Sequence, residues 1–281
     1  MDFSIRLKVN LKNFILEENN FTLKEISFEV CRGQALAILG PSGSGKTTLL
    51  KVLDGLYKDY EGEILLDNIE LKKLTPKEIY KKMGLLFQNP EEQLFAEKVF
   101  EDVGFGPKNM GWPDEKIKES VKKALELVSL SGFELKAIHK LSFGEKKRVA
   151  LAGLLAMGHE ILLLDEPTLG LDPLLEKNFM ELLLNLKNRG YTIIMATHNV
   201  DLVPYFAEKV LILKDGNMVL YGETKEVLSN AKELRKCNLR PPLITELFMS
   251  FKDKLPSNSL PFTKEEALML LSSLLKEKSL K

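Results

Sequence analysis

Short apolar runs separated by polar segments recur along most of the chain. Each run has the length and the branched or aromatic residues that are typical of buried or half-buried strands. The strands predicted in this way are Ile26–Val30, Leu36–Leu39, Ile64–Leu66, Gly84–Phe87, Ile161–Leu164, Thr192–Ala196, Val210–Leu213 and Met218–Tyr221. Between the last two, Lys214–Asn217 carries the Asp-Gly pair that is typical of a hairpin turn.

Two longer segments have a helical pattern instead. Residues Asp114–Leu130 place Ile117, Val121 and Leu125 at helical spacing, and Leu174–Asn188 is a second amphipathic helix. Strands that alternate with helices predict the α/β fold class, with a largely parallel sheet flanked by helices.

The same pattern suggests how the chain is organised. Residues 90–158 contain helix and loop without a clear strand, so we expect a helical subdomain there, inserted into a main domain of residues 1–235. In residues 236–281 the composition changes, and Leu239–Pro242 breaks the chain before a further helix. The apolar stripe of that helix is Leu243, Ile244, Leu247, Phe248 and Phe251.

A second helix is expected near the C-terminal end. A loop with Pro256 and Pro261 leads to Thr263–Glu266, a capping box that opens a leucine-rich helix through Leu275. Two short helices cannot bury a core of their own. We therefore expect them to pack on the main domain or on a second subunit.

The segment Gly40–Thr47 matches the phosphate-binding loop G-x-x-x-x-G-K-[ST]. A predicted buried strand precedes it and a helix follows it, whereas a simple glycine turn is the alternative interpretation. The glycines let backbone N–H groups surround a phosphate, while Lys46 reaches the β- and γ-phosphates and the hydroxyl of Thr47 ligates Mg²⁺. The predicted phosphate-binding residues are Gly40, Pro41, Ser42, Gly43, Ser44, Gly45, Lys46, Thr47 and Thr48.

Two carboxylates follow the apolar run Ile161–Leu164, at the strand end where open α/β sheets bind ligands. Asp165 is expected to hold Mg²⁺, directly or through water. Glu166 is expected to polarise the water that attacks the γ-phosphate. The alternative is that the pair only caps a helix.

Composition limits the class of protein. The chain has 281 residues, and 40 basic side chains balance 40 acidic ones, which argues against a general nucleic-acid surface. Cys31 and Cys237 lack metal-ligand spacing, as in chains of a reducing compartment. Neither a secretory signal nor a membrane span is predicted. We expect a cytosolic protein, or one held at a membrane by partners.

The order of these motifs, together with Leu141–Glu145, Gly170–Asp172 and His198, resembles that of an ABC-type ATPase over residues 1–235. The resemblance implies a P-loop ATPase domain with a parallel-sheet core, an antiparallel β subdomain and an inserted helical subdomain, followed by a short helical C-terminal extension. It implies that Gln88 ligates Mg²⁺. It also implies that His198 contacts the γ-phosphate and helps to hold Glu166.

In that family, the pentapeptide corresponding to Leu141–Glu145 contacts ATP bound by the opposite subunit, with Ser142 and Gly144 making the contacts. This chain has Phe143 where the family usually has Gly, and Glu145 where Gln is frequent. Residue 143 must therefore adopt a conformation open to a residue with a Cβ. A simple helix N-cap at Ser142 is the alternative.

Further roles are implied by the same resemblance. Asp172 lies in the loop that crosses to the partner subunit, although it could equally be an N-cap before Pro173. An aromatic side chain usually stacks on adenine, and Phe14 is the candidate, with Phe21 second. Both could instead be part of the core.

The segment Gln88–Ala96, followed by Glu101–Pro107, resembles ATPases of energy-coupling-factor importers, especially those of the cobalt type. There it forms a short helix that receives the membrane partner. Leu94 and Phe95 would give an apolar surface, and Glu91 and Glu92 could pair with arginines. The alternative is a structural helix with a solvated acidic face. In that family the C-terminal extension supports dimerisation.

These features lead to one functional expectation. The chain is expected to be the ATP-hydrolysing subunit of a membrane importer for a transition-metal ion, with cobalt as the preferred solute. Its cofactors would be ATP and Mg²⁺. Its partners would be a second ATPase subunit, identical or paralogous, and integral membrane components. Its location would be the cytoplasmic face of the cell membrane.

Three alternatives remain open. The chain could be an energy-coupling-factor ATPase shared by vitamin or nickel importers. A soluble mechanochemical ATPase is disfavoured by the short segment between Thr47 and Leu141 and the lack of a basic stripe. A nucleotide-gated binding module without turnover is disfavoured by the presence of both Glu166 and His198.

Overall fold

The computed structural model describes residues 4–18, 21–251, 255 and 260–279. The strands are β1 Ile5–Leu16, β2 Phe21–Cys31, β3 Ala35–Leu39, β4 Tyr60–Leu66, β5 Ile69–Glu70, β6 Met83–Leu86, β7 Ile161–Asp165, β8 Thr192–Thr197, β9 Lys209–Lys214 and β10 Asn217–Glu223. The helices are α1 Lys46–Leu53, α2 Pro76–Tyr80, α3 Val99–Val103, α4 Phe105–Asn109, α5 Asp114–Leu127, α6 Phe143–Ala156, α7 Pro173–Asn188, α8 Thr224–Ser229, α9 Ala231–Lys236, α10 Leu243–Met249 and α11 Lys264–Ser279.

The ten strands of the described residues join one sheet in the order β5-β4-β1-β2-β10-β9-β3-β8-β7-β6. Strands β9, β3, β8, β7 and β6 run parallel, whereas β5, β4, β1 and β2 pair antiparallel. Every predicted strand is present, and Asp215 and Gly216 form the predicted hairpin turn with positive φ angles of 47° and 75°. The prediction of an α/β fold with a parallel core is therefore confirmed.

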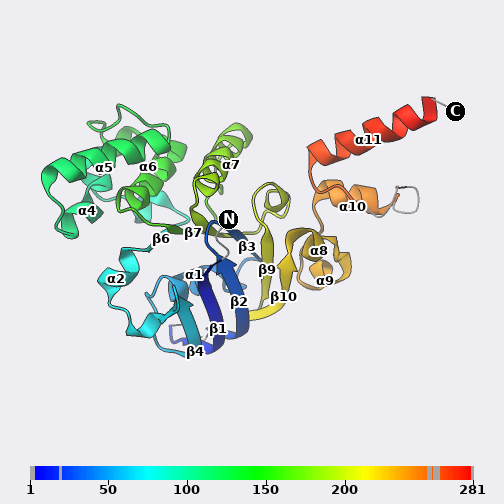
Figure 1. Ribbon diagram of the computed structural model, residues 1–281, viewed down its shortest axis with the longest axis horizontal. Coiled ribbons are helices and arrows are strands. Elements are labelled where there is room, and N and C mark those ends of the chain that lie inside the picture. Colours follow the sequence, from blue (N-terminus) through cyan, green and yellow to red (C-terminus); the bar gives the residue numbers. More distant parts are fainter. Residues whose placement is uncertain (1–3, 19–20, 252–254, 256–259, 280–281) are drawn as a thin grey trace.

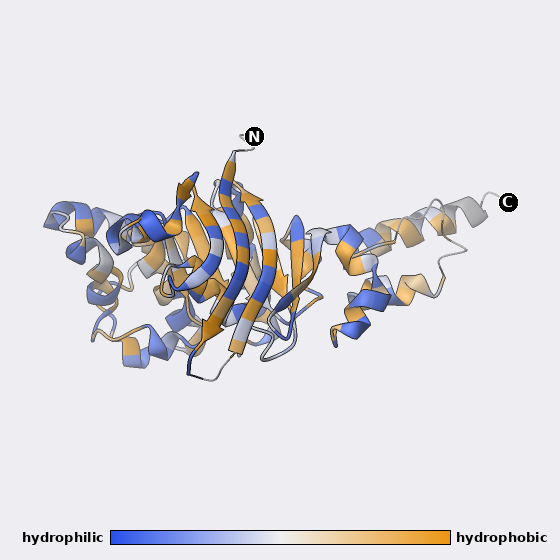
Figure 2. Ribbon diagram, turned by 90° about the horizontal axis from the view of Figure 1, so that it is seen from below, coloured by the Kyte–Doolittle hydropathy of each residue, from blue (hydrophilic) through white to orange (hydrophobic). Residues whose placement is uncertain are grey.

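Strand β1 is present although it was not predicted. It buries Leu7, Val9 and Leu11 while Lys8 and Asn10 stay exposed between them. Such alternation is typical of a strand with one solvated face. Figure 2 shows hydrophobic and hydrophilic residues alternating in this way along strands of the sheet.

Both faces of the parallel strands are covered by other elements. Successive side chains of a strand point to opposite faces, so each strand contributes to two cores. On β7, Leu162 and Leu164 belong to a core shared with helices α5, α6 and α7. Ile161 and Leu163 belong to a second core with α1 and the antiparallel strands. Because helices hold the parallel sheet from both sides, the ends of its strands have defined positions, and so do the loops that follow them.

Helices α3 to α6 gather at one side of the molecule, where residues 90–158 form the green part of Figure 1. As the sequence predicts, this segment contains no strand, only an isolated bridge between Lys98 and Ala137. The division of the chain into domains stays a prediction.

The C-terminal helices α10 and α11 lie at the opposite side (Figure 1). Phe262 and Ala267 are buried and the hydroxyl of Thr263 accepts a hydrogen bond from the N–H of Glu266 at 3.2 Å, as expected for the predicted helix start. Leu247 and Leu271 remain 56% and 44% exposed. Pro256 lies outside the described residues. Within the part of the chain that the structure describes, no helix has the length and apolar character to span a membrane.

Candidate nucleotide site

The site is built where neighbouring parallel strands end together. Leu39 of β3 pairs with Thr197 of β8, Asp165 of β7 pairs with Ala196, and β6 lies beside β7. The loops that follow these four strands begin with Gly40, His198, Glu166 and Phe87 respectively. Sheet topology thus collects segments far apart in the sequence at the carboxyl edge, as in other open α/β sheets.

The loop between β3 and α1 has the shape that its glycines permit. Gly43 and Gly45 have φ angles of 78° and 102°, in the left-handed region. A Cβ on Gly40 would lie 2.4 Å from the carbonyl oxygen of Leu213, whereas a Cβ on Gly43 would meet nothing within 4 Å. The loop is therefore packed at its base and open at Ser42 and Gly43. Thr48, in α1, is half-buried.

Lys46 is the first residue of α1 and is 7% exposed. Its ammonium donates to the carbonyl oxygens of Gly40 at 2.8 Å and Pro41 at 3.2 Å, and lies 3.7 Å from Oε1 of Glu166. Burial lowers the pKa of Lys46, and the charges of Glu166 and Asp165 act in the opposite direction. The ammonium is thus held at the mouth of the loop by groups that a phosphate could replace.

Asp165 and Thr47 meet across the site. The hydroxyl of Thr47 donates to Oδ2 of Asp165 at 2.6 Å, while Oδ1 of Asp165 is buried without a hydrogen-bond partner. Burial raises the pKa of Asp165, and the hydrogen bond from Thr47 opposes this rise. An unpaired buried carboxylate oxygen beside a hydroxyl is suited to an additional cation.

The carboxylate of Glu166 contacts two nitrogen atoms of His198. Nδ1 of His198 is 2.9 Å from Oε1, and the backbone N–H of His198 donates to Oε2 at 3.4 Å. With Glu166 ionised, Nδ1 carries the proton in this bond, so the ring is oriented by the carboxylate. Glu166 itself has a φ of 43°. The structure therefore brings together the predicted pair, whereas Gln88 is exposed two residues beyond the end of β6.

The pentapeptide Leu141–Glu145 begins helix α6. Ser142 is its N-cap and forms a capping box with Glu145: the Ser142 hydroxyl accepts from the N–H of Glu145 at 3.2 Å, and the carboxylate accepts from the N–H of Ser142 at 2.7 Å. Either Glu or Gln can close such a box. Phe143 is the first helical residue, a position that tolerates a Cβ, and Leu141 and Gly144 are buried.

Asp172 is the N-cap of α7 and accepts hydrogen bonds from the N–H groups of Leu174 at 3.0 Å and Leu175 at 2.9 Å. The capping alternative is therefore present in the structure. A role in contacting a second subunit stays a prediction.

The structure contradicts the choice of Phe14 for adenine stacking. Phe14 is only 4% exposed, and its ring packs at 5.4 Å from that of Tyr57 in the core. A ring buried in this way has no free face for a base. Phe21 is half-buried, and a Cβ on Gly45 would lie 2.7 Å from its Cζ, which places this ring beside the phosphate loop.

The predicted docking residues form an exposed patch before α3. Phe95 is 65% exposed and its ring meets that of Phe105 edge to face at 4.6 Å. Glu91 and Glu92 are exposed, and Glu91 pairs with Lys146 of α6 at 2.6 Å. Leu94 lines a hollow of about 250 Å³ beside this pair. Within residues 88–107, Pro90–Glu92 forms a 3-10 turn and Val99–Val103 forms the short helix α3.

One buried residue beside the site, Lys147, is not among those predicted from the sequence. It lies on α6 and is 1% exposed, and its ammonium donates to the carbonyl oxygens of Glu166 and Pro167. In the sequence, Lys147 is simply a lysine five residues after Ser142. A lysine in a helix is usually solvated, so its buried role becomes visible only in the fold.

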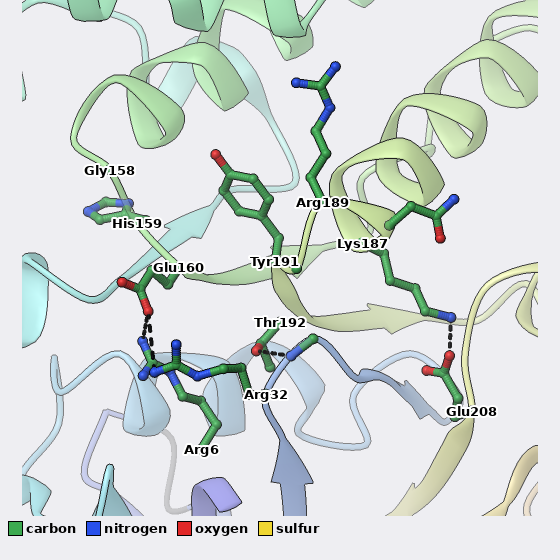
Figure 3. Close-up of a pocket in the computed structure, with 13 residues that line it drawn as sticks. Arg6, Arg32, Gly158, His159, Glu160, Lys187, Arg189, Tyr191, Thr192 and Glu208 are labelled. Carbon is green, nitrogen blue, oxygen red and sulfur yellow. Dashed lines mark hydrogen bonds and ion pairs between the residues drawn. The ribbon is translucent and has the colours of Figure 1, made fainter. Parts of the chain in front are cut away.

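A cavity of about 640 Å³ lies at the other end of the parallel strands, where β7 and β8 begin (Figure 3). Its charged side chains are largely paired: Arg6 with Glu160, and Lys187 with Glu208. None of the predicted site residues lines it. The nucleotide site is therefore a surface of loops at the carboxyl edge and not this cavity.

Comparison with known proteins agrees with this geometry. The family described as ABC transporter matches residues 23–169. The chain belongs to the ABC transporter family. The loops after β3, β6 and β7 lie in or at the end of the matched segment, and the chain is an ABC-type ATPase.

Relatives of full length support the same conclusion. A putative ABC transporter ATP-binding protein of Geobacter sulfurreducens is 50% identical over 266 residues, covering 94% of this chain and 95% of that protein. An energy-coupling factor transporter ATP-binding protein of Methanocaldococcus jannaschii is 45% identical over 247 residues, 86% of this chain and 88% of that protein. The resemblance to the energy-coupling-factor type is thereby confirmed.

Two solved structures are similar in fold. CbiO1 of Clostridium perfringens, described as part of the ABC transporter complex CbiONQ, has a TM-score of 0.75 and 38% identity, covering 87% of this chain and 99% of that one. A dimeric ATP-binding cassette bound to ADP and phosphate has a TM-score of 0.68 and 29% identity, covering 79% of this chain and 99% of that one.

Proposed function

We propose that this chain is the ATP-hydrolysing subunit of a membrane importer for a transition-metal ion, with cobalt as the preferred solute. The observation that carries the hydrolytic part is the Glu166 carboxylate, held between His198 and Lys46 at the strand ends. The similarity to CbiO1 of the CbiONQ complex supports a role in an ABC transporter complex, and the metal ion rests on the resemblance of Gln88–Ala96 to the cobalt type. Relatives named energy-coupling factor transporter ATP-binding proteins support the energy-coupling-factor type. The second candidate is an ATPase of this type that serves vitamin or nickel importers.

The residues present fit a magnesium ion. Thr47 and Asp165 offer hard oxygen ligands, and Oδ1 of Asp165 has no other partner. Mg²⁺ in nucleotide sites uses one or two carboxylates together with phosphate oxygens and water, so a larger protein ligand set is not needed. Gln88 is the further proposed ligand, directly or through water. When bound, Mg²⁺ would neutralise charge on the β- and γ-phosphates.

The roles of the other side chains follow from their positions. Residues 40–48 would bind the phosphates through backbone N–H groups and Lys46. Glu166 would orient the attacking water and accept its proton, and His198 would keep the carboxylate in place. Phe21, the aromatic ring beside the loop, is the proposed adenine contact.

A second subunit is proposed to complete the site. No hydrogen bond or ion pair joins residues 141–145 to residues 40–48 within the described chain. We propose that Ser142 and Gly144 contact ATP bound by the other subunit, with Leu141, Phe143 and Glu145 supporting the helix start, and that Asp172 contributes to the interface. ATP held by both halves would favour a closed dimer, and its hydrolysis would release that dimer.

Contacts with other components are proposed on two surfaces. The patch of Glu91, Glu92, Leu94 and Phe95 would receive an integral membrane partner, which would hold the chain at the cytoplasmic face of the membrane. Apolar side chains of α10 and α11, together with Phe251 and Leu255, line a hollow of about 680 Å³ and would support dimerisation. No nucleic-acid partner is proposed.

Replacing Glu166 by Gln tests the hydrolytic role. An amide cannot accept the proton, so kcat for ATP should fall by about 10² to 10⁴-fold, while ATP is still bound and the dimer is stabilised. Steady-state hydrolysis, nucleotide binding and light scattering would measure these effects. Glu181→Gln, on the exposed face of α7, is the matched control. Undiminished hydrolysis by a pure Glu166→Gln preparation would remove Glu166 from its proposed role.

The transported solute needs a separate experiment. Co-expression with its membrane components and measurement of ATP-dependent uptake in vesicles should show accumulation of cobalt. Uptake of a vitamin or of nickel without cobalt would instead favour the second candidate.

A further inference from the structure

A fully buried lysine links the helix that begins at Ser142 to the turn that carries Glu166. Nζ of Lys147 donates to the carbonyl oxygen of Glu166 at 3.2 Å and to that of Pro167 at 2.9 Å. Burial lowers the pKa of Lys147 to about 8, although the charges of Glu166 and Asp165 oppose this. An ammonium in an apolar setting is costly compared with an apolar side chain of the same length. Its presence therefore indicates a use for its hydrogen bonds.

The turn that Lys147 binds has an unusual backbone. Glu166 adopts a left-handed conformation, with a φ of 43°, which is uncommon for a residue with a Cβ. Such a conformation persists only where surrounding contacts determine it. The N–H of Glu166 donates to the carbonyl oxygen of Ala196, and its own carbonyl accepts from the N–H of Leu169 as well as from Lys147. Lys147 thus fixes the peptide planes on which the direction of the Glu166 side chain depends.

The start of α6 also packs along the same turn. The ring of Phe143 lies one helical turn from Lys147, with its centroid 5.2 Å from Nζ. A Cβ on Gly170, which has a φ of 81°, would lie 3.0 Å from that ring. A Cβ on Gly144 would meet the side chains of Leu175 and Leu171 at 3.4 and 3.5 Å. Residues 143–147 and 166–175 therefore move as one packed unit, or must break these contacts to move apart.

We propose that Lys147 is a positioning residue that transmits the position of α6 to the carboxylate of Glu166, and so couples the two ATP sites of a dimer. The start of α6 would sense the nucleotide bound by the other subunit, and Lys147 would adjust Glu166 in this subunit's own site. Lys147 acts through the backbone of Glu166 and not on the reacting atoms. The inference rests on the proposed function, because it requires two subunits that share two sites.

Substitution of Lys147 in the full-length chain tests this. Lys147→Met removes both hydrogen bonds while keeping the unbranched side chain up to the position of Cε, and Lys147→Gln keeps a donor group, the amide NH2. In Lys147→Met, kcat for ATP should fall about 10 to 100-fold, and the Hill coefficient for ATP should fall from above 1 to about 1. The Kd for ATP measured without Mg²⁺ should stay within about threefold. For Lys147→Gln, kcat and the Hill coefficient should lie between those of Lys147→Met and those of the original chain. Lys123→Met, an exposed lysine of α5, should match the original chain.

Two measurements separate a positioning role from a merely structural one. A structural role lowers the melting temperature and the fraction of folded protein, but leaves kcat per ATP-binding site and the Hill coefficient unchanged. If Lys147→Met does not fold, Lys147→Gln is judged by the same criteria. Original values of kcat and of the Hill coefficient in a folded variant would overturn the proposal, as would a Hill coefficient of about 1 in the original chain. An original chain that hydrolyses no ATP would instead refute the proposed function itself.

Discussion

Asp54 is a buried carboxyl whose ionisation opposes folding. It closes α1 and is 6% exposed, and its Oδ1 is buried without a hydrogen-bond partner. Burial raises its pKa to about 7. A carboxylate at a helix C-terminus is also disfavoured by the helix dipole. The folded state therefore binds this proton more tightly than the unfolded chain does.

The sign of the pH dependence follows from this difference. Because the folded pKa lies above the unfolded value, stability decreases as the pH rises from about 4 to about 7 and stays low above that. Asp54→Asn should therefore raise the free energy of unfolding by on the order of 2–4 kcal/mol at pH 8, and the gain should shrink toward pH 4. Urea unfolding at several pH values measures this. Asp59→Asn, an exposed neighbour, is the control, and a gain that does not vary with pH would contradict the explanation.

Single residues differ in how far their roles could be predicted. Lys46, Thr47 and Asp165 were predicted from short motifs, because their chemistry depends on neighbours in sequence, and the structure places the three close together. Phe14 was wrongly chosen, because an aromatic residue on a strand can face the core or a ligand and the sequence does not say which. Lys147 was missed for the converse reason, since its partners are carbonyl groups on a distant turn.

Elements buried on both faces were the easiest to predict. Leu36–Leu39 and Ile161–Leu164 are continuous apolar runs, and the structure buries them fully. Strand β1 was missed because its exposed face interrupts the apolar pattern with Lys8 and Asn10. The turn Pro90–Glu92 is too short to have a helical period of its own.

The patch before α3 gives a prediction at this scale. Glu92→Lys combined with Phe95→Ser should reverse a charge and remove an exposed apolar ring from the proposed docking surface. Transport per ATP hydrolysed, measured in vesicles with the membrane partner, should fall about tenfold or more. Glu91 is left intact because it already pairs with Lys146.

A charge reversal elsewhere in residues 90–158 is the matched control. Glu115→Lys lies on α5, where this side chain is 86% exposed, and should leave coupling unchanged. Equal transport per ATP in the double variant and the original chain would remove the patch from docking.

The C-terminal helices can be tested at the scale of the whole molecule. Removing residues 236–281 would also remove Phe262, which is buried against the main core, so point substitutions are cleaner. Leu247→Glu with Leu271→Glu places charges on the exposed apolar side chains of α10 and α11. We expect the dimer Kd without nucleotide to rise about tenfold or more, as measured by sedimentation equilibrium.

A matched control separates dimerisation from general stability. Leu135 lies in residues 90–158, away from α10 and α11 in the sequence, and is 81% exposed. Leu135→Glu should leave the dimer Kd unchanged. A double variant that dimerises as tightly as the original would show that the extension has another purpose.

The sequence by itself determined the α/β class, the phosphate loop and the acidic strand end, because these depend on local periodicity and on residues that are close in the chain. Tertiary structure alone decided that Phe14 is buried and that Lys147 holds the turn after β7. These contacts join segments that only the order of strands brings together. The left-handed backbone of Glu166 belongs to this second group, because no local pattern requires it and distant hydrogen bonds hold it in place.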